Sequence, residues 1–476
     1  MTSQFLCIHA HFYQPPREDP LTGVIPVEAG ASPYQNWNER IHAECYRLNA
    51  ELGNFSRISF NVGPTLFSWM ESFHPETVHQ IIAQDRANQS TFGVGNAIAQ
   101  SYNHTILPLA SYQDKVTQVF WAIREFEHRF GHKPLGMWLP ETAVDIETLG
   151  VLASQGIEFT ILAPWQVHAD DPDVTRPYRI NLPGGQKITA ILYHAGLSGG
   201  ISFNPALTVD ADHFANHELR LQFNVGKVNT SEPQLILLAS DGELYGHHQP
   251  LRDHFLARLV NGASHLAGLV PTYPALWLKT YPTQHTTEIK EATSWSCHHG
   301  IARWSQGCDC TPGNSTWKSL LRQAFDHLCR ELDHLYIRFV SPHIDDAWEL
   351  RNRYIDVMLG LQTVEDLVAQ MAGRKLPAEL TTQVHLLLEA QRERQRMYTS
   401  CGFFFEDFDR IEPKNNLAYA AQAVRLAHMA TGVNLAPSLL FDLHQVVSER
   451  TGLRGDAVFL QHLRRADRDG RIVAGD

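Results

Sequence analysis

Short apolar runs alternate with helical patterns over the first three hundred residues, and polar residues follow each run. The runs are continuously apolar, which is typical of strands buried on both faces of a parallel sheet covered by helices. They occupy residues 5–8, 58–62, 137–139, 157–162, 188–193 and 235–238. The pattern therefore predicts an α/β fold with its functional residues at the carboxyl ends of the strands.

One strand–helix–strand unit can be followed closely. After the run at 137–139, Asp145 is placed to cap a helix that Gly156 ends before the next strand. Such a crossover puts Glu141 in the short loop between strand and helix. This position is on the functional side of the predicted sheet.

The period of the apolar positions becomes helical from about residue 315, after a break at Pro312 and Gly313. Helices are predicted near residues 315–332, 355–371, 378–397, 415–430, 437–450 and 454–465. We therefore expect a barrel domain at 1–310 and a helical region at 311–476. The amphipathic helices need a partner surface, so we expect the region to pack on the barrel.

The apolar segment at residues 401–405 is too hydrophobic for a free loop. Glu406, Asp407 and Asp409 follow it, and their carboxylates need water or partners. We therefore predict that the segment lies beside the catalytic cleft; the alternative is a purely structural plug.

Composition and charge exclude several functional classes. Lys and Arg number 39 against 51 Asp and Glu, a net charge of −12 that would repel nucleic acid and anionic lipid. The chain has neither an apolar run long enough to cross a membrane nor a visible export signal, and its seven cysteines are few. We expect a cytoplasmic protein with neither nucleic acid nor membrane as partner, and the oligomeric state is left open.

Four segments concentrate histidines, carboxylates and aromatic residues at predicted strand ends. They are residues 9–15 (HAHFYQP), 101–109 (SYNHTILPL), 136–145 (GMWLPETAVD) and 240–248 (SDGELYGHH). Acids and bases fixed at several strand ends are what proton transfer and covalent catalysis require. The pattern is therefore typical of an active site.

In order and spacing, these segments resemble the conserved regions of glycoside hydrolase family 57, whose members cleave or rearrange α-glucans. The resemblance implies a distorted (β/α)7-type barrel followed by an α-helical C-terminal region. It also implies that Glu141 in WLPE is the nucleophile and Asp241 in DGELYG the acid/base. Residues 291–310 and 398–413 resemble the branch that carries a C-terminal domain of unknown function.

By this resemblance we expect a retaining enzyme that acts on an α-glucan or maltooligosaccharide without a cofactor. The activity would be α-amylase-like hydrolysis, 4-α-glucan transfer or branching. The predicted substrate-binding residues are His11, Gln14, His104, Trp138, Glu243, Tyr245, His248, Trp295 and Trp304.

The same residues also allow simpler and rival interpretations. Glu141 can be a carboxylate near a helix start, and Asp241 can belong to an ordinary Asp-Gly turn. His9 and His11 share one face of a strand, as the ligands of a metal-dependent deacetylase or mannosidase-like enzyme would. A catalytically silent glucan-binding protein is the third alternative.

Cys297, Cys308 and Cys310 lie near His298 and His299 and raise the question of zinc. Their C-x10-C-x-C spacing departs from the paired spacing of structural zinc sites. Separate buried thiols are the simpler interpretation, and no metal site is predicted.

Overall fold

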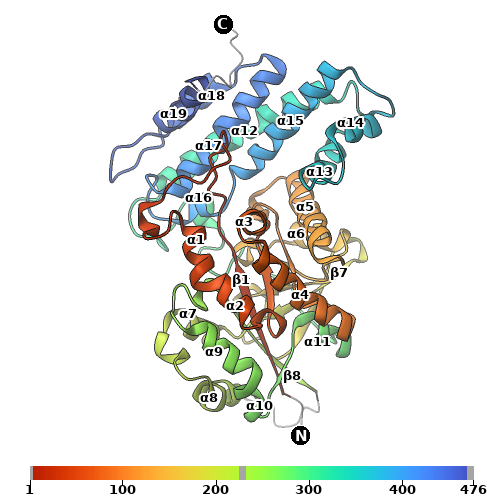
Figure 1. Cartoon of the computed structure of the whole chain (residues 1–476), viewed down its shortest axis with the longest axis vertical. Helices are drawn as coiled ribbons and strands as arrows, with labels where there is room; N and C mark the ends of the chain where they lie inside the picture. Colours follow the sequence, from red (N-terminus) through yellow and green to blue (C-terminus); the bar gives the residue numbers. More distant parts are fainter. Residues whose placement is uncertain (1–3, 224–231, 469–476) are drawn as a thin grey trace. The chain divides into compact units, whose positions relative to one another are not determined.

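The computed structural model describes residues 4–223 and 232–468, and the chain forms two compact units (Figure 1). The first unit consists of Met1–Gln14, Val27–Tyr102 and Phe126–Trp295. The second consists of Pro15–Pro26, Asn103–Glu125 and Ser296–Asp476. This division differs from the predicted cut between residues 310 and 311, because two earlier segments of the chain join the helical unit.

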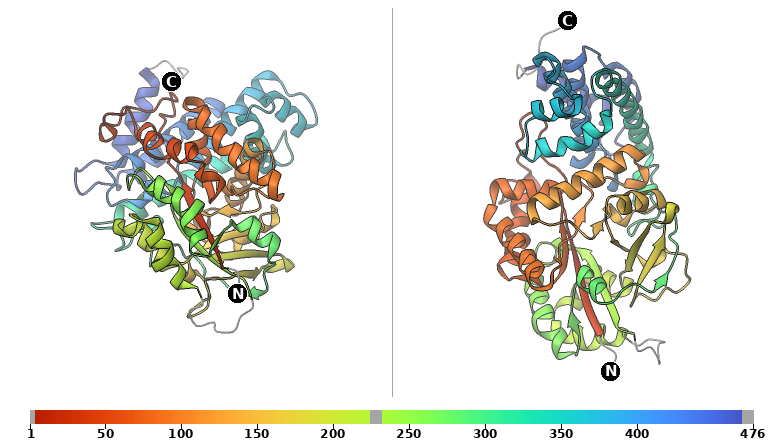
Figure 2. Two further views of the ribbon diagram at one scale, coloured as in Figure 1. Left: turned by 60° about the horizontal axis from the view of Figure 1, so that its bottom comes forward. Right: turned by 90° about the vertical axis from the view of Figure 1, so that its right-hand side faces the viewer.

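Strand β1 (Gln4–Phe12) is the central strand of the first unit. It pairs in parallel along its length with β8 (Gln234–Asp241), and its second half pairs in parallel with β2 (Ser59–Val62). The short β9 (Val270–Pro271) pairs with the start of β1. Figure 2 shows β1, in red, running through the middle of this unit with helices on either side.

Further parallel neighbours extend the sheet beyond β2. They are β3 (Ala99–Gln100), β4 (Met137–Trp138), β5 (Phe159–Leu162) and β7 (Lys187–Leu192). Bridges from Phe60 to Ala97 and from Gly136 to Phe159 join the separate ladders. Among the described residues no ladder joins β7 to β8, although the His194 N–H donates to the Leu237 carbonyl at 2.7 Å. The α/β class is confirmed, and a closed seven-stranded barrel stays a prediction.

The six predicted strands are all present, but β1 and β8 extend further than their apolar runs indicate. His9 and His11 consequently lie within β1, and Asp241 is the last residue of β8. The predicted helix is α6 (Ile146–Ser154), and the Asp145 side chain accepts a 2.7 Å hydrogen bond from the Thr148 N–H. The cap prediction is confirmed.

The sequence patterns did not indicate β3, β9, β6 (Pro177–Asn181) or β10 (His285–Thr286). Strand β6 runs antiparallel to β7, and β10 pairs with β6. The other three have only two residues each, too few to show an alternation, and β6 begins at a proline. The remaining helices of this unit are α1 (Trp37–Ile41), α2 (Arg47–Glu51), α3 (Pro64–Phe73), α4 (Pro75–Phe92), α7 (Ala195–Phe203), α8 (Ala211–His213), α9 (Arg252–Arg258), α10 (Ser264–Leu266) and α11 (Pro274–Thr280).

The second unit is helical and is built around α12 (Thr316–Val340), α15 (Ala378–Arg396) and α17 (Ile411–Thr431), which pack together (Figure 1). The helix predicted near residues 355–371 is divided in the structure between α13 (Ala347–Met358) and α14 (Val364–Ala372), which are separated at Gly360, where φ is 69°. The others are α16 (Cys401–Phe404), α18 (Ala436–Leu443) and α19 (Gly455–Arg468). No helix in the described ranges has both the length and the apolar composition needed to cross a bilayer.

The acidic stretch after α16 finds partners within the second unit. Asp409 pairs with Arg450, and the Asp407 carboxylate accepts from the backbone N–H groups of Asp409 and Arg450. Glu406 lies 3.6 Å from the Arg410 guanidinium. These contacts favour the structural role for this segment.

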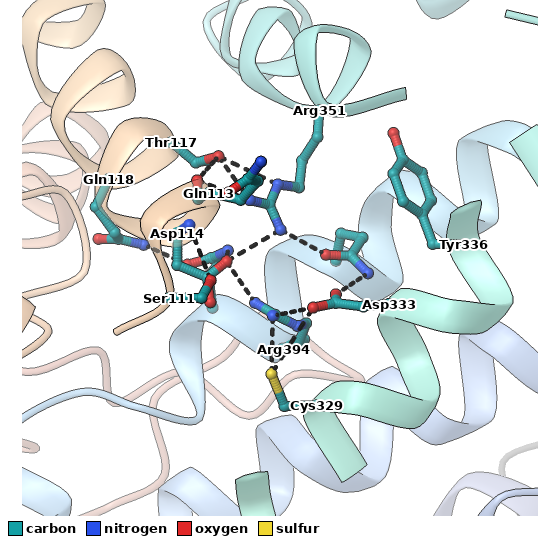
Figure 3. A network of polar contacts seen from close by, with 12 residues as sticks. Ser111, Gln113, Asp114, Thr117, Gln118, Cys329, Asp333, Tyr336, Arg351 and Arg394 are labelled. Carbon is teal, nitrogen blue, oxygen red and sulfur yellow. Dashed lines mark hydrogen bonds and ion pairs between the residues drawn. The ribbon is translucent and has the colours of Figure 1, made fainter. Parts of the chain in front are cut away.

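A buried network of charges ties the first part of α5 (Tyr112–Phe130) to the helices of the second unit (Figure 3). The Asp114 carboxylate lies 2.8 Å from the Arg394 guanidinium and 3.1 Å from that of Arg351, and both arginines are fully buried. Arg394 also pairs with Asp333 at 2.6 Å. Burial alone would raise the pKa of Asp114, but Arg394 and then Arg351 outweigh it and hold the pKa well below its usual range.

We expect Asp114→Ala to lower the free energy of unfolding by about 3–5 kcal/mol, because two buried guanidinium groups lose their shared carboxylate. A carboxylate with a lowered pKa stabilises above its ordinary pKa of 3.8, and the stabilisation is lost as the pH falls. The difference between wild type and variant in urea denaturation should therefore shrink below that pH. Asp212→Ala is the control, since Asp212 pairs with Arg258 at the surface, and equal effects of the two variants would contradict the prediction.

Candidate active site

The register of the central strands places two predicted site residues, His11 and Asp241, beside the polar residue Asn61. His11 of β1 is paired with Asp241 of β8 on one side and with Asn61 of β2 on the other. Because all three strands are parallel, these residues share the carboxyl edge of the sheet. The first and the last of the four sequence motifs, which are more than two hundred residues apart in the chain, thus meet at this edge.

Asn61 is the centre of a buried polar network. Its amide nitrogen lies 2.9 Å from His11 Nδ1 and donates to Gln100 Oε1 at 2.7 Å, and its carbonyl oxygen lies 3.1 Å from His9 Nε2. The hydroxyl of Ser59 lies 2.9 Å from His9 Nδ1. The network connects three neighbouring strands through side chains and fixes both histidine rings.

Both histidines are neutral, since burial is the largest influence and lowers the pKa of each to about 3. His11 Nδ1 lies 2.9 Å from the amide nitrogen of Asn61 and 3.3 Å from its carbonyl oxygen, so this one side chain holds the ring in place. Both ring nitrogens of His9 already bond to protein groups, which leaves no lone pair for a metal. Within the described ranges, neither histidine belongs to a group of three or more metal-ligand side chains.

Trp138, at the end of β4, stacks on both histidines, with ring centroids 4.8 Å from His9 and 5.0 Å from His11. Its side chain is fully buried and belongs to the core of the first unit. The indole therefore positions the histidine rings, and its faces are covered by protein.

Glu141 has a strained backbone. It follows β4 in a short 3-10 turn (Pro140–Thr142) with φ 56° and ψ 20°, and Thr142 also has a positive φ of 49°. A non-glycine residue in the left-handed region costs on the order of 1–3 kcal/mol and is found most often at functional sites. The Gln166 side chain holds the turn, since it accepts from the Thr142 hydroxyl at 2.9 Å and donates to the Thr142 carbonyl at 2.8 Å.

Trp295 orients the Glu141 carboxylate. Its indole N–H donates to Glu141 Oε2 at 3.0 Å, and its backbone N–H donates to the Glu141 carbonyl at 3.0 Å. The Trp295 ring contacts the edge of Trp138 at 5.0 Å between centroids. A double connection of this kind fixes both the backbone and the carboxylate of Glu141.

The environment of Asp241 keeps it protonated near neutral pH. The side chain is solvent-accessible at the end of β8, but surrounding protein groups remove much of its hydration. This desolvation, followed by the negative charge of Glu141, raises the pKa of Asp241 to about 7. The two predicted catalytic carboxyl groups therefore interact electrostatically, and one of them holds a proton that it can donate.

Glu243 is a second carboxyl group with a raised pKa. It is buried, and burial followed by the charge of Asp241 raises its pKa to about 8. Its Oε1 accepts from the Tyr46 hydroxyl at 2.7 Å and from the Tyr13 backbone N–H at 3.0 Å. Glu243 thus fixes the segment that follows β1.

Gly242, between the two acids, is required by close packing. A Cβ at this position would lie 2.3 Å from the Phe12 ring. Because glycine has no side chain, the backbone of Gly242 can lie against Phe12. The acidic residues on either side of it are thereby held beside β1.

The other predicted residues divide between the two units. In the first, Gln14 hydrogen-bonds the Tyr46 hydroxyl, the buried Tyr245 hydroxyl accepts from Ser240 at 3.3 Å, and His248 is exposed. In the second, His104 Nδ1 lies 2.6 Å from the Ser400 hydroxyl, and Trp304 is fully buried near Phe404. A ring without exposed surface offers no platform for a sugar.

Sequence reasoning missed Asn61, Gln100, Tyr46 and Gln166. Asn61 was within a predicted strand, and a lone amide in a buried strand is a signal, because its polar groups need partners. Gln100 and Gln166 lie in or near elements too short for a pattern to reveal. The interaction of Trp295 with Glu141 joins residues 154 positions apart, and nothing local predicts it.

Comparison with known proteins shows the family of the chain. Residues 8–273 match the model of glycosyl hydrolase family 57, and residues 314–475 match a domain of unknown function, DUF3536. Alpha-amylase 1 of Dictyoglomus thermophilum is 28% identical over 97 residues, which are 20% of this chain and 13% of that protein. The aligned part thus spans only a small fraction of that curated relative.

Solved structures of low sequence identity share the fold. The exo-type maltose-forming amylase of Pyrococcus sp. ST04 has a TM-score of 0.73 at 16% identity, covering 97% of this chain and 88% of that one. The GH57-type branching enzyme of Pyrococcus horikoshii has a TM-score of 0.63 at 13% identity, covering 96% of each chain. Since the family match alone covers more than half of the 476 residues, the chain belongs to glycosyl hydrolase family 57.

Proposed function

We propose that the protein is a retaining α-glucan-active enzyme in which Glu141 is the nucleophile and Asp241 the acid/base. One observation carries the proposal: the raised pKa of Asp241 beside the charge of Glu141. A retaining glycosidase needs such a pair, with one ionised carboxylate and one protonated carboxylic acid. The similar solved structures, among them an amylase, a branching enzyme and a 4-alpha-glucanotransferase, support α-glucans as substrates.

In the first step, a Glu141 oxygen attacks the anomeric carbon while the bond from that carbon to the leaving oxygen breaks. Asp241 gives its proton to the leaving oxygen. In the second step, the ionised Asp241 takes a proton from water or a sugar hydroxyl, whose oxygen attacks the same carbon and releases Glu141. Water gives hydrolysis, whereas a sugar hydroxyl gives transfer or branching.

The neighbouring residues have distinct proposed roles. Trp295 orients the attacking carboxylate, and His11, the register partner of Asp241 at the strand ends, is proposed to contact the sugar. Glu243 holds the segment after β1 through Tyr46 and Tyr13. Gln14, Tyr245 and His248 of the first unit remain proposed substrate-binding residues. Trp138 is proposed to act through the histidine rings on which it stacks, whereas His104 and the buried Trp304 belong to the second unit.

The decisive experiment measures products from maltooligosaccharides and from glycogen with wild type, Glu141→Gln and Asp241→Asn. We expect each variant to lose at least about 10³-fold in kcat/KM, because each removes one partner of a two-carboxyl mechanism. Chain-length and linkage analysis of the wild-type products distinguishes hydrolysis, disproportionation and branching. Binding of maltooligosaccharides without turnover by folded wild type would replace the proposal with a glucan-binding protein.

Glu243→Gln tests which carboxyl group is the proton donor. The glutamine keeps an acceptor for Tyr46 and Tyr13 and is neutral, as Glu243 is below its raised pKa. We expect this variant to stay within about tenfold of wild-type kcat/KM, the cost of about 1.4 kcal/mol in a positioning contact. A loss as large as that of Asp241→Asn would assign proton donation to Glu243.

The activity should depend on pH through Asp241. A proton donor with a pKa of about 7 predicts that kcat/KM falls above pH 7, with a slope of one decade per pH unit. For stability the sign is opposite to that of Asp114: a raised pKa stabilises fully below 3.8, and the contribution is lost as the pH rises through 7. Asp241→Asn should therefore raise the melting temperature at pH 9 more than at pH 5, and an equal shift at both would contradict the assignment.

Trp295→Phe should lower kcat more than it raises KM, because it removes the hydrogen bond that orients the Glu141 carboxylate. A hydrogen bond to a charged group contributes about 1.5–3 kcal/mol, so we expect a loss of about tenfold to a hundredfold. Trp165→Phe is the matched control, because its indole N–H donates to the Ser294 carbonyl at 3.0 Å. Equal losses in the two variants would assign Trp295 to packing alone.

A further inference from the structure

Four metal-ligand side chains of the second unit point to one place. The sulfur atoms of Cys297, Cys308 and Cys310 and a ring nitrogen of His299 all lie within 4.8 Å of one another. Cys297 Sγ is 3.5 Å from Cys308 Sγ and 3.8 Å from Cys310 Sγ, and Cys310 Sγ is 3.4 Å from His299 Nδ1. This group is separate from the strand-end residues described above.

These distances are the edges of a tetrahedron of metal ligands. With Zn–S bonds of about 2.3 Å at tetrahedral angles, two sulfur ligands lie about 3.8 Å apart. A disulfide would require sulfur atoms about 2.05 Å apart, and all three cysteines are free. The side chains are therefore arranged for one small cation between them, with small adjustments of their rotamers.

The backbone delivers the ligands in two pairs. Cys297 and His299 are separated by one residue, as are Cys308 and Cys310, so the pattern is C-x-H-x8-C-x-C. The spacing of the cysteines alone does not reveal this pairing, because the fourth ligand is a histidine. Gly300 and Gly307 turn the chain between the pairs with φ of 72° and 82°. A Cβ on Gly307 would lie 2.1 Å from the Ser315 hydroxyl oxygen, so the second turn admits only glycine.

The segment that carries these ligands has little regular structure to hold it. Between β10 and α12 the only helix or strand among the described residues is the 3-10 turn Ala302–Trp304. Irregular segments of more than about 12–15 residues are uncommon in compact units unless something else fixes them. A metal cross-link between the two pairs would supply that constraint.

Two cationic side chains next to the cluster complement its charge. Three thiolates and one neutral imidazole around a divalent cation leave one net negative charge. Lys318 is fully buried, within electrostatic range of Cys297 and Cys308, and its ammonium lies 3.5 Å from the Thr311 hydroxyl, just after Cys310. The guanidinium of the buried Arg303 reaches the Cys310 carbonyl at 3.5 Å. A buried lysine is expensive unless an opposite charge lies near.

We propose that Cys297, His299, Cys308 and Cys310 bind one Zn²⁺ in a closed, four-coordinate structural site. Each cysteine thiol gives its proton to solvent as its sulfur binds the metal, and His299 binds through a neutral ring nitrogen. Four protein ligands leave no open position, so the site stabilises the segment and has no part in the sugar chemistry. Iron–sulfur clusters generally take four thiolates, which this group does not provide.

The test is the metal content of the full-length protein, purified without chelator and dialysed against metal-free buffer. Inductively coupled plasma mass spectrometry should find one zinc ion per chain in wild type and less than a tenth of that amount in Cys308→Ser. Cys401→Ser is the matched control, because Cys401 is also a free, partly exposed cysteine of the second unit and is not in the cluster. It should retain the full zinc content.

His299 provides a test that does not depend on losing a cysteine. His299→Cys would create a four-thiolate site and should keep one zinc per chain, whereas His299→Ala should lose it. A strong chelator should lower the melting temperature of wild type and His299→Cys and leave that of His299→Ala unchanged. These readouts are independent of glucan turnover, so they distinguish failure of this proposal from failure of the proposed function.

Three results would overturn the proposal. Wild type that retains no zinc after addition of a small excess and dialysis would show that the group is not a zinc site. Five free thiols per metal-free chain (7 − 2 = 5) would show a disulfide within the cluster instead. Iron with visible absorbance in place of zinc would assign the group to a cluster cofactor.

Discussion

The parallel register of β1 between β8 and β2 is the constraint on which the site depends. Asp241, His11 and Asn61 are neighbours only because each strand pairs at one specific register. A slip of one residue would replace His11 by Ala10 or Phe12 and turn every side chain of the strand to the other face. The fully buried apolar residues of β1 and β8 oppose such a slip, so the energy of the core fixes the position of the polar groups.

The two carboxyl groups depend on each other electrostatically. Loss of hydration and the negative charge of Glu141, the proposed nucleophile, are the two influences that raise the pKa of Asp241. In the proposed mechanism, that repulsion is gone once Asp241 has given up its proton and Glu141 has become an ester. The pKa of Asp241 then falls, so that its ionised form persists and can act as a base. The pKa rises again when Glu141 is released, and this difference favours alternation between the two roles.

Sequence patterns predicted the elements better than the contacts between them. The six strands and the helix capped by Asp145 follow from local periodicity and capping, which depend on neighbouring residues. The division into units does not, because residues 103–125 join the helical unit through charges on α13 and α15 that are far away in sequence. The contacts of Asn61, Gln100 and Trp295 are equally non-local. The motifs predicted roles for Glu141 and Asp241, whereas the strained backbone of Glu141 and the raised pKa of Asp241 depend on the three-dimensional structure.

The second unit resolves two problems of burial by the same means. Arg351 and Arg394 are fully buried, and the negative charges of Asp114 and Asp333 next to them offset the free energy lost by dehydrating the two guanidinium groups. Lys318 is equally buried, and a metal-bound set of thiolates would place a negative charge beside it. The first arrangement uses side chains from regular helices, whose packing fixes their distances. The segment after Trp295 has almost no regular structure, so an arrangement of charges alone would not keep its geometry, and four bonds to one cation would.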